Sequence, residues 1–590
     1  AQRLPNTGNG CSGSFANDFN FSEQGQGHWN GKTTASDDDG VYHNISIVKS
    51  SVPQVVKLHS QVSFITAVAT SLEGDAAEIA ADAFHAASAE SSEKLFQEHM
   101  LAWGDLHTSG IDVGGNLDVA THANASKYFI LSSVREDWPV GVSPGGAACM
   151  SYHGAIFMDM DMWMLPAFLL MRPSIAHAML EYRFISIPVA RDTAHVFGYN
   201  GTHFPWTSSF KGHPFGCCNG KGGNENCLEQ HNIGSVAFQA WKYYQATGDR
   251  EWLTARGWPL LQGVAEWVVS RVTPSGKGRF DLNGILPVDE WCVNGGCGCG
   301  FPGVSNDAFT NGVMKLATRF AAEASVLLGK GIESSWTDIS NGIPLLWNSS
   351  HGHHDQFTSP SCPSGWGGGH YTAQTVCPED VGLLSYPLGV DLGISEEVSR
   401  ADAELFFPIT CKENAGMTTP IHTIVWLALG EKAKAQEEFN RDLAGACYGP
   451  FLVRNEVDKH QDIIGDHNDN SHFLTGDGGL LQALLFGYGA IRTVNDTLQL
   501  SAPDFPEGVT TLTLRNMSWR GSQFTLRHEA SVTGSSARST FTAESSTGMC
   551  LENAAKRKFT AHQAIPMPLL RFPMTLSEGL CGGADVAAFV

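Results

Sequence analysis

The stretch HNIGSVAFQAWKYYQATGD, residues 231–249, carries the clearest structural signal in the chain. Its apolar side chains recur at the spacing that places them on one face of an α-helix, and they are Ile233, Val236, Ala237, Ala240, Trp241 and Tyr244. The pair Gly248-Asp249 predicts the end of this helix, because glycine readily adopts the left-handed conformation of a helix C-terminus. A second helix is predicted directly after it, with an apolar face of Leu261, Val264, Ala265, Val268 and Val272.

Three further segments repeat this helical pattern at residues 306–329, 420–443 and 478–492. Long loops rich in Gly, Pro and Cys separate the helices, and helix pairs joined in this way are typical of stacked α-hairpins. Loops of such length in a compact domain usually carry function. The middle of the chain is therefore predicted to be one large helical domain.

The chain has other patterns on either side of the helical region. Residues 55–71 mix alternation with β-branched residues and predict strands, whereas the Ala- and Glu-rich residues 73–107 predict one or two helices. Residues 498–532 alternate apolar and polar side chains between turn signals, which predicts a small β-sandwich. We expect four parts: a β segment at 1–72, a helical linker at 73–114, the helical domain at 115–492 and a β-sheet domain at 493–590.

The charge composition of the chain argues against some classes of binding partner. The 590 residues include 37 Lys and Arg against 60 Asp and Glu, a formal net charge of −23. Such a surface repels phosphate groups, so we expect neither nucleic acid nor an anionic membrane as a partner. No run of about 18 apolar residues occurs, so no membrane span is predicted.

The 14 cysteines indicate an oxidising compartment. Several lie in polar, Gly-rich loops, GCCNGKGGNENC at 216–227 and CVNGGCGCG at 292–300, which is typical of disulfides. A zinc site is the alternative, but the short spacings are C-x4-C and C-x-C without a second pair of C-x2-C type. We therefore predict disulfide bonds, no metal and no cofactor.

N-glycosylation sequons support the same compartment weakly, and the chain begins with a polar stretch, as a processed exported protein would. We expect a secreted or extracellular protein, or one of a lysosome- or vacuole-like compartment. N-glycans are expected at some of Asn44, Asn124, Asn200, Asn348, Asn495 and Asn516.

Four segments combine aromatic side chains with carboxylates or turns. They are 152–166 with Asp159 and Asp161, 202–212 with Trp206, 285–296 with Asp289, Glu290 and Trp291, and 450–460 with Glu456. Aromatic faces stack on pyranose rings and carboxylates bind their hydroxyls, while cleavage of a glycosidic bond needs a carboxylic acid and a second carboxylate. Taken from the residues alone, each acid also suits a helix cap or a surface charge.

These segments resemble glycoside hydrolase family 65 in order and spacing. YHGAIFMDMDMWMLP (152–166) is similar to the family's Y-R-G-H-x-F-W-D-x-E-x-W-M-x-P, and Phe204, Trp206 and Ser208 match its F-x-W-x-S. VDEW resembles its P-D-E-Y, SNDAFTN (305–311) its N-N-x-Y-T-N, and FLTGDGGLLQALLFGYGAIR (473–492) its closing helix. The resemblance covers about residues 60–530 and is greatest to the glucosylgalactosylhydroxylysine glucosidase and acid trehalase type.

The resemblance implies a mainly α fold, an (α/α)6 barrel with an N-terminal β-sandwich and a small C-terminal β-sandwich. The N-terminal sandwich is expected to be truncated, since only about 70 residues precede the linker. It also implies an inverting α-glucosidase acting on a glycosylated protein or a disaccharide such as trehalose or kojibiose. Glu290 is the expected general acid and Glu456, placed before the closing helix, the expected general base. The expected sugar-binding residues are Asp159, Phe157, Met158, Trp206 and Trp291.

Departures from the family pattern leave alternatives open. Ala155 and Met158 replace a His and a Trp, and Cys377 and Pro378 replace a sugar-binding Lys-Gln pair. Proline has no N–H to donate and cysteine donates weakly. An inverting disaccharide phosphorylase of the same family, or a non-catalytic extracellular sugar-binding or structural protein, are the alternatives. Phosphorylases of the family carry a His before the final Gly-Gly, where this chain has Phe473 beside His472.

Overall fold

The computed structural model of the protein describes most of the chain. The described residues are 19–25, 27–33, 37, 39–51, 55, 59, 62–138, 140–147, 152, 154–214, 228–288, 303–331, 333–358, 380–410, 416–445, 447–448, 450–456, 472–531, 538–543, 549–553, 558–561, 564–567 and 574–578. They divide into two compact units, residues 1–108 and 109–590.

The first unit contains one antiparallel sheet and two helices. The sheet has the order β1-β2-β3-β4, and α1 packs against β3 and β4. Asp75 and Ser91 cap the two helices, each accepting backbone N–H groups of the first turn. The elements are β1 (Phe19–Gly25), β2 (His28–Thr33), β3 (Asn44–Lys49), β4 (Thr66–Thr70), α1 (Ala76–Ser88) and α2 (Ser92–Leu106).

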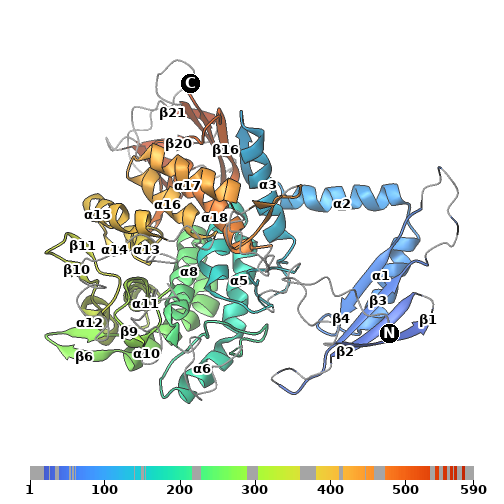
Figure 1. Ribbon diagram of the computed structural model, residues 1–590, viewed down its shortest axis with the longest axis horizontal. Helices are drawn as coiled ribbons and strands as arrows, with labels where there is room; N and C mark the ends of the chain where they lie inside the picture. The colour runs from blue at the N-terminus through green and yellow to red at the C-terminus, as the bar shows by residue number, and fades with distance from the viewer. Residues whose placement is uncertain are drawn as a thin grey trace. The chain divides into compact units, whose positions relative to one another are not determined.

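The second unit is mainly helical, and its helices gather in one body (Figure 1). The α-helices are α3 (Leu117–Leu131), α4 (Leu165–Met171), α5 (Pro173–Ile185), α6 (Ile187–Val196), α8 (His231–Thr247), α9 (Arg250–Trp252), α10 (Trp258–Arg271), α11 (Ala308–Leu327), α12 (Ser334–Gly342), α13 (Gly382–Ser385), α14 (Gly389–Leu392), α15 (Glu396–Phe406), α16 (Thr418–Ala428), α17 (Lys432–Gly445) and α18 (Leu474–Gln482). Wider π-helical turns are η2 (Met160–Met164), η3 (Leu253–Gly257) and η5 (Ala483–Tyr488), and η4 (Phe407–Ile409) is a 3-10 turn.

The predicted helix at 231–249 is confirmed as α8, and Gly248 ends it with a φ of 67°. The expected single apolar face is wrong, however, because every residue from His231 to Ala246 is buried. Helices α4, α5, α10 and α11 all pack against α8. Its polar residues therefore need partners inside the protein, and Lys242 pairs with Asp391 at 2.6 Å.

The other predicted helices form with shifted ends. The segment 306–329 becomes α11, capped by Asp307, whose carboxylate accepts the Thr310 N–H at 2.8 Å. The segment 420–443 is a hairpin of α16 and α17, which packs as a pair. It breaks at Gly430, whose φ of 76° a helix does not allow.

Two five-stranded antiparallel sheets lie at the end of the second unit. Their orders are β14-β15-β22-β19-β20 and β21-β18-β17-β16-β5, and β16 packs against α4 and α8. Residues 110–114, the last of the predicted helical linker, form strand β5 and pair with β16. The strands are β5 (Gly110–Gly114), β14 (Ile491–Val494), β15 (Thr497–Leu500), β16 (Thr511–Trp519), β17 (Ser522–Glu529), β18 (Arg538–Ala543), β19 (Met549–Asn553), β20 (Lys558–Ala561), β21 (Ala564–Met567) and β22 (Met574–Glu578).

Short two-stranded sheets interrupt the loops between the helices. Strands β8 and β9 pair on either side of residues 286–303, and β12 and β13 come directly before Glu456. These hairpins hold the ends of two loops that carry predicted site residues. The strands are β6 (Thr273–Gly276), β7 (Arg279–Asp281), β8 (Asn283–Ile285), β9 (Val304–Ser305), β10 (Trp347–Asn348), β11 (His353–His354), β12 (Cys447–Tyr448) and β13 (Val453–Arg454).

A buried guanidinium joins three segments of the helical body. Arg183 of α5 is 1% exposed and donates to both carboxylate oxygens of Asp161 in η2, at 2.5 and 3.2 Å. Its Nη2 also donates to the Phe157 carbonyl at 3.0 Å and to the Asn232 side chain of α8 at 3.4 Å. Asn232 in turn donates to the Pro205 carbonyl at 2.6 Å. These hydrogen bonds thus fix the positions of residues 157–161, α8 and the 202–212 loop relative to one another.

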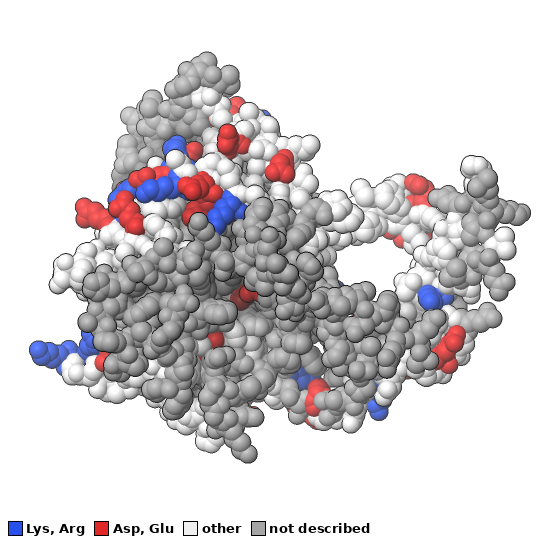
Figure 2. All heavy atoms as spheres, viewed as in Figure 1, with Lys and Arg blue, Asp and Glu red and all other residues white. Residues whose placement is uncertain are grey.

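The surface charges of the second unit alternate in sign over α15 and α17, on the face that Figure 2 shows. Arg400 of α15 illustrates the pattern, with Glu431 at 2.6 Å and Glu396 at 3.3 Å. Exposed pairs of this kind add little to folding stability, because water and salt screen them. No helix among the residues with described structure is long and apolar enough to cross a membrane.

We expect Arg183→Met to destabilise the fold by about 3–5 kcal/mol, because it leaves the Asp161 carboxylate buried without its counter-ion. The measurement is urea unfolding followed by circular dichroism. Arg279→Met is the matched control, since Arg279 is 45% exposed in its pair with Asp281 and should cost at most about 1 kcal/mol. Equal losses in the two variants would contradict the role given to Arg183.

Candidate functional site

The aromatic wall of the site comes from two segments joined by a single β-bridge. Ile156 and Ser208 exchange backbone hydrogen bonds of 2.8 and 3.0 Å. This bridge places Phe157 beside Trp206, with ring centroids 5.0 Å apart and the planes at 82°. Both rings are half-buried, so they offer a partly open apolar surface of the kind that sugar rings contact.

Asp159 lies two residues beyond this wall and is 8% exposed. Its Oδ1 accepts a hydrogen bond from the Thr475 hydroxyl at 2.6 Å. Burial raises the pKa of Asp159 to about 6, the negative charge of Glu456 adds to the rise, and the Thr475 hydrogen bond opposes it. Asp159 is therefore a carboxyl group that exchanges its proton near neutral pH.

Glu456 lies near Asp159, just after β13, and is half-buried. The Tyr152 hydroxyl donates to its Oε2 at 2.9 Å, and its carbonyl accepts the Gly416 N–H at 2.5 Å. Burial and the charge of Glu456 raise the pKa of Tyr152 well above its ordinary value, so this phenol stays protonated as a donor. The Tyr152 ring also meets the Phe157 ring edge to face at 6.0 Å. One tyrosine thus connects the aromatic wall with Glu456.

The glycines of the TGDGG segment bring Thr475 to Asp159. A Cβ at Gly478 would lie 2.4 Å from the Trp163 carbonyl oxygen, and one at Gly479 would lie 2.9 Å from Pro420. Only glycine allows α18 to approach η2 and α16 this closely. The first turn of α18, which carries Thr475, is therefore seated against the segment that carries Asp159.

A small cavity with about 250 Å³ of empty space lies beside this cluster. Trp163 borders it and donates from its indole nitrogen to the Met417 carbonyl at 3.1 Å. Val288, two residues before Glu290, is also part of the wall. The wall of this cavity consists of Trp163, Val288, Leu383, Met417, Thr418, Ile421 and His422.

The structure brings together four of the residues that the sequence singled out: Phe157, Asp159, Trp206 and Glu456. Met158 is only 3% exposed and faces the core. Several other predicted residues lie outside the described part of the chain. These are Glu290, Trp291, Cys377 and Pro378, and the side chains of all 14 cysteines lie outside it too.

Two residues of the cluster were not singled out from the sequence, Tyr152 and Thr475. Both lie inside motifs that were recognised, Tyr152 as the first residue of 152–166 and Thr475 in TGDGG. Their hydroxyls bind the carboxylates of the two candidate acids from more than 300 positions away in the chain. The two motifs therefore marked the segments that contain Tyr152 and Thr475, but only the folded structure shows that these residues bind Glu456 and Asp159.

His472 lies at the edge of the cluster without facing a charged group among the described residues. Its Nδ1 lies 3.0 Å from the Gly145 carbonyl oxygen and its ring packs on Phe129 at 4.9 Å. Burial lowers the pKa of His472, so the imidazole is neutral near pH 7. A neutral imidazole whose Nδ1 is hydrogen-bonded to the Gly145 carbonyl is a poor ligand for a phosphate dianion.

Comparison with known proteins shows which family shares these motifs. A model described as the glycosyl hydrolase family 65 central catalytic domain matches residues 128–338. The chain is 30% identical to a protein-glucosylgalactosylhydroxylysine glucosidase of Dictyostelium discoideum, over 82% of this chain and 64% of that protein. It is 31% identical to a kojibiose hydrolase of Flavobacterium johnsoniae, over 69% of this chain and 55% of that protein. The chain thus spans about half to two thirds of the length of these relatives.

A solved structure assigned as a kojibiose phosphorylase from the human microbiome superposes with a TM-score of 0.69 at 14% identity, over 93% of this chain and 77% of that one. This likeness confirms the mainly helical barrel with flanking β segments. A protein-glucosylgalactosylhydroxylysine glucosidase of Danio rerio is 30% identical, and the match covers 80% of this chain and 70% of that protein. With the family motifs gathered around Asp159, the chain belongs to glycosyl hydrolase family 65.

Proposed function

We propose that the protein is a glycoside hydrolase that releases glucose from an α-glucoside with inversion at the anomeric carbon. The observation that carries the proposal is the pair formed by Glu456 and its donor Tyr152 beside Asp159 and the aromatic wall. A half-buried carboxylate that accepts a hydrogen bond from a phenol can act as a general base toward a water molecule.

In the proposed reaction Glu290 is the general acid and Glu456 the general base. Glu290 gives its proton to the glycosidic oxygen as the bond from that oxygen to the anomeric carbon breaks. A water molecule attacks the anomeric carbon from the opposite face and gives its proton to Glu456. Glu290 ends as a carboxylate and Glu456 as a carboxylic acid, so one proton returns from Glu456 to Glu290 through solvent before the next cycle.

Asp159 is proposed to bind hydroxyl groups of the glucosyl ring that leaves. The Thr475 hydroxyl occupies its Oδ1, which leaves Oδ2 for the sugar. Phe157 and Trp206 would contact the apolar ring face, with Trp291 completing the pocket, whereas the buried Met158 would support the wall from behind. A carboxyl group with a pKa near 6 can either accept or donate a hydrogen bond to a hydroxyl, depending on its protonation.

The substrate class follows from the family relatives. Their names specify kojibiose and glucosylgalactosylhydroxylysine, so we propose an α-glucosyl disaccharide or a glycosylated protein side chain as the substrate. The described residues Asp159, Phe157 and Trp206 supply the proposed glucosyl side of the site.

A disaccharide phosphorylase is the second candidate, favoured by the structural likeness to a kojibiose phosphorylase. The attacking group would then be phosphate, and Glu456 would repel it while His472 offers no positive charge. Assays on kojibiose, trehalose, nigerose, maltose and glucosylgalactosylhydroxylysine should thus show glucose release that is independent of phosphate. Glucose 1-phosphate formation would assign the chain to the phosphorylases instead.

We also propose that the protein is exported, with disulfides in the 216–227 and 292–300 loops and N-glycans on some sequons. The support is the density of cysteines in Gly-rich loops next to Trp206 and Glu290. Loop-closing disulfides contribute about 2–4 kcal/mol each to stability. Mass spectrometry of unreduced peptides should find these cysteines bridged, and free thiols throughout both loops would exclude the bonds.

We predict that Glu290→Gln lowers kcat on natural α-glucosides by several orders of magnitude, because glutamine cannot protonate the leaving oxygen. Hydrolysis of α-glucosyl fluoride should fall far less, since fluoride leaves without a proton. The measurement is steady-state kinetics of both proteins on both substrates. Equal losses on the two substrates would remove Glu290 from the role of acid.

We predict that Asp159→Asn stabilises the fold near neutral pH while it weakens glucose binding. The folded-state pKa of about 6 exceeds the ordinary 3.8, so the stability that Asp159 contributes is complete below about pH 4 and is lost as pH rises through 6. Two units correspond to about 3 kcal/mol. Urea unfolding should therefore show the variant gaining about 2–3 kcal/mol over the wild type between pH 3.5 and 7. A difference that does not change with pH would contradict the buried, protonatable state of Asp159.

A further inference from the structure

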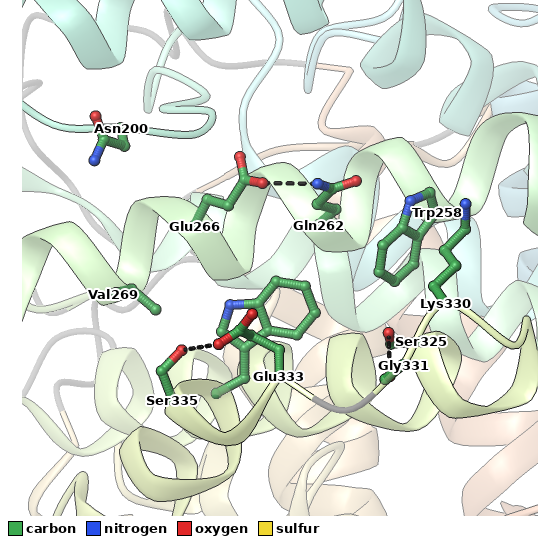
Figure 3. Close-up of a pocket in the computed structure, with 11 residues that line it drawn as sticks. Asn200, Trp258, Gln262, Glu266, Val269, Ser325, Lys330, Gly331, Glu333 and Ser335 are labelled. Carbon is green, nitrogen blue, oxygen red and sulfur yellow. Dashed lines mark hydrogen bonds between the residues drawn. The ribbon is translucent and has the colours of Figure 1, made fainter.

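A second and larger cavity lies on the outside of the helical body, between α10 and the link from α11 to α12. It holds about 1280 Å³ of empty space, open to solvent, and Figure 3 shows its lining side chains. It shares no residue with the cluster around Asp159 and Glu456. Its chemistry therefore has to be explained separately.

Helix α10 presents one face to this cavity. Trp258, Gln262, Glu266 and Val269 follow one another at helical spacing and line it. The opposite face of α10 is buried in the body, with Leu261, Val264, Ala265 and Val268 each 0% exposed. This face therefore combines a half-buried tryptophan with an amide and a carboxylate that are also half-buried.

Two tryptophans form the apolar floor of the cavity. The rings of Trp258 and Trp336 lie 6.0 Å apart with their planes at 51°, so their faces form an open angle. Trp336 is 6% exposed and Trp258 is half-buried. Lys330 caps one side of Trp258, with its Nζ 5.0 Å from the ring. Such a platform is suited to the apolar face of a pyranose ring.

Hydrogen-bonding groups stand above this floor. Gln262 donates from Nε2 to Glu266 Oε1 at 2.7 Å, which fixes both side chains. The Gln262 carbonyl oxygen and the second Glu266 oxygen have no partner among the described residues, and Figure 3 shows both groups along one edge of the cavity. Glu333 lies across from them and accepts the Ser335 hydroxyl at 3.0 Å. Acceptors held rigidly over an aromatic floor recognise sugar hydroxyls.

The charge of the cavity argues against an anionic ligand. Glu266 and Glu333 outnumber Lys330, whose ammonium is already placed over Trp258. A phosphate or sulfate group would meet two carboxylates and one shared cation. The lining thus fits a neutral, hydroxyl-rich ring.

Asn200 stands at the rim and suggests where such a ring can come from. It is exposed and begins the sequon Asn200-Gly201-Thr202. Its backbone N–H donates to the Ser270 hydroxyl at 3.0 Å, which anchors the rim next to the C-terminal turn of α10. Thr202 is fully buried, so the sequon is open to modification only before this segment folds. A glycan on Asn200 would emerge at the Ser270 end of α10, about 18 Å along the helix from Trp258 at 1.5 Å per residue, so only sugars beyond its first units can reach that ring.

We propose that this cavity is a second carbohydrate-binding site, in which a neutral pyranose ring stacks on Trp258 and binds Gln262 and Glu266. Two sources offer that ring: an outer sugar of an N-glycan on Asn200, or a saccharide from solution. The proposal does not depend on the reaction proposed for Asp159, Glu290 and Glu456.

The first experiment tests the saccharide from solution. Calorimetric titration of the Glu290→Gln protein with kojibiose, maltotriose and N,N′-diacetylchitobiose separates binding from turnover. Trp258→Ala in this background should weaken one binding event by about fivefold to tenfold, the usual effect of losing an aromatic platform. Trp347→Ala is the matched control, since Trp347 is 45% exposed and lies outside the cavity.

The second experiment tests the attached glycan, in protein produced by glycosylating cells. If the glycan of Asn200 rests on Trp258, an endoglycosidase should remove it from the native protein about tenfold more slowly than the glycan of Asn124, which is exposed on α3. Trp258→Ala should abolish the difference, and Trp347→Ala should preserve it. Mass spectrometry of the glycopeptides gives both rates.

Either result supports the site and identifies its source. The proposal is overturned if Trp258→Ala and Trp347→Ala bind all three saccharides alike and the Asn200 glycan is absent or is removed as fast as that of Asn124. Should Trp258→Ala fail to fold, Glu266→Gln and Gln262→Ala replace it, because both residues are half-buried on the helix surface.

Discussion

The interaction on which the site depends is the buried contact between Arg183 and Asp161. Neither group is exposed, so each would be costly to bury without the other. The guanidinium has donors left over and uses them on the Phe157 carbonyl and on Asn232. Through Asn232 it also reaches the backbone just before Trp206. The aromatic wall and the segment bearing Asp159 are therefore positioned by one cation outside the pocket.

Asp159 and Asp161 belong to the same motif, but their surroundings give the two carboxyl groups different charge states. Asp161 has a guanidinium across both oxygens, whereas Asp159 has only a neutral hydroxyl and a nearby carboxylate. The first is a structural anion and the second a carboxyl group that titrates near pH 6. The π-helical turn from Met160 to Met164 starts between them, and such turns often occur at functional sites.

The sequence predicts the elements of this fold better than their partners. The periodicity of 231–249 identifies α8, but not that α8 is covered on all sides, because its neighbours α4, α5 and α11 lie far away in the chain. Residues 110–114 join a sheet with β16, which lies about 400 positions later. Periodicity is local, whereas burial and strand pairing are set by the whole fold.

In the site, too, the sequence predicts individual residues better than the contacts between them. Family motifs predict Asp159 and Trp206 as site residues, and the position before the closing helix predicts Glu456. The hydroxyls that act on the two acids, from Tyr152 and Thr475, become recognisable only when the helical body closes. Likewise, the pairing of Trp258 on α10 with Trp336 on α12 can be recognised only in the folded structure.

The central claim is that water reaches the anomeric carbon from the Glu456 side, opposite the leaving group. Inverting glycosidases place their two carboxyl groups about 6.5–9.5 Å apart to leave room for that water. Proton NMR of the glucose released from α-glucosyl fluoride or glucosylgalactosylhydroxylysine, recorded before mutarotation, tests this directly, because the only glucose formed is the glucosyl ring itself. The account predicts β-glucose as the first product, and α-glucose would contradict it.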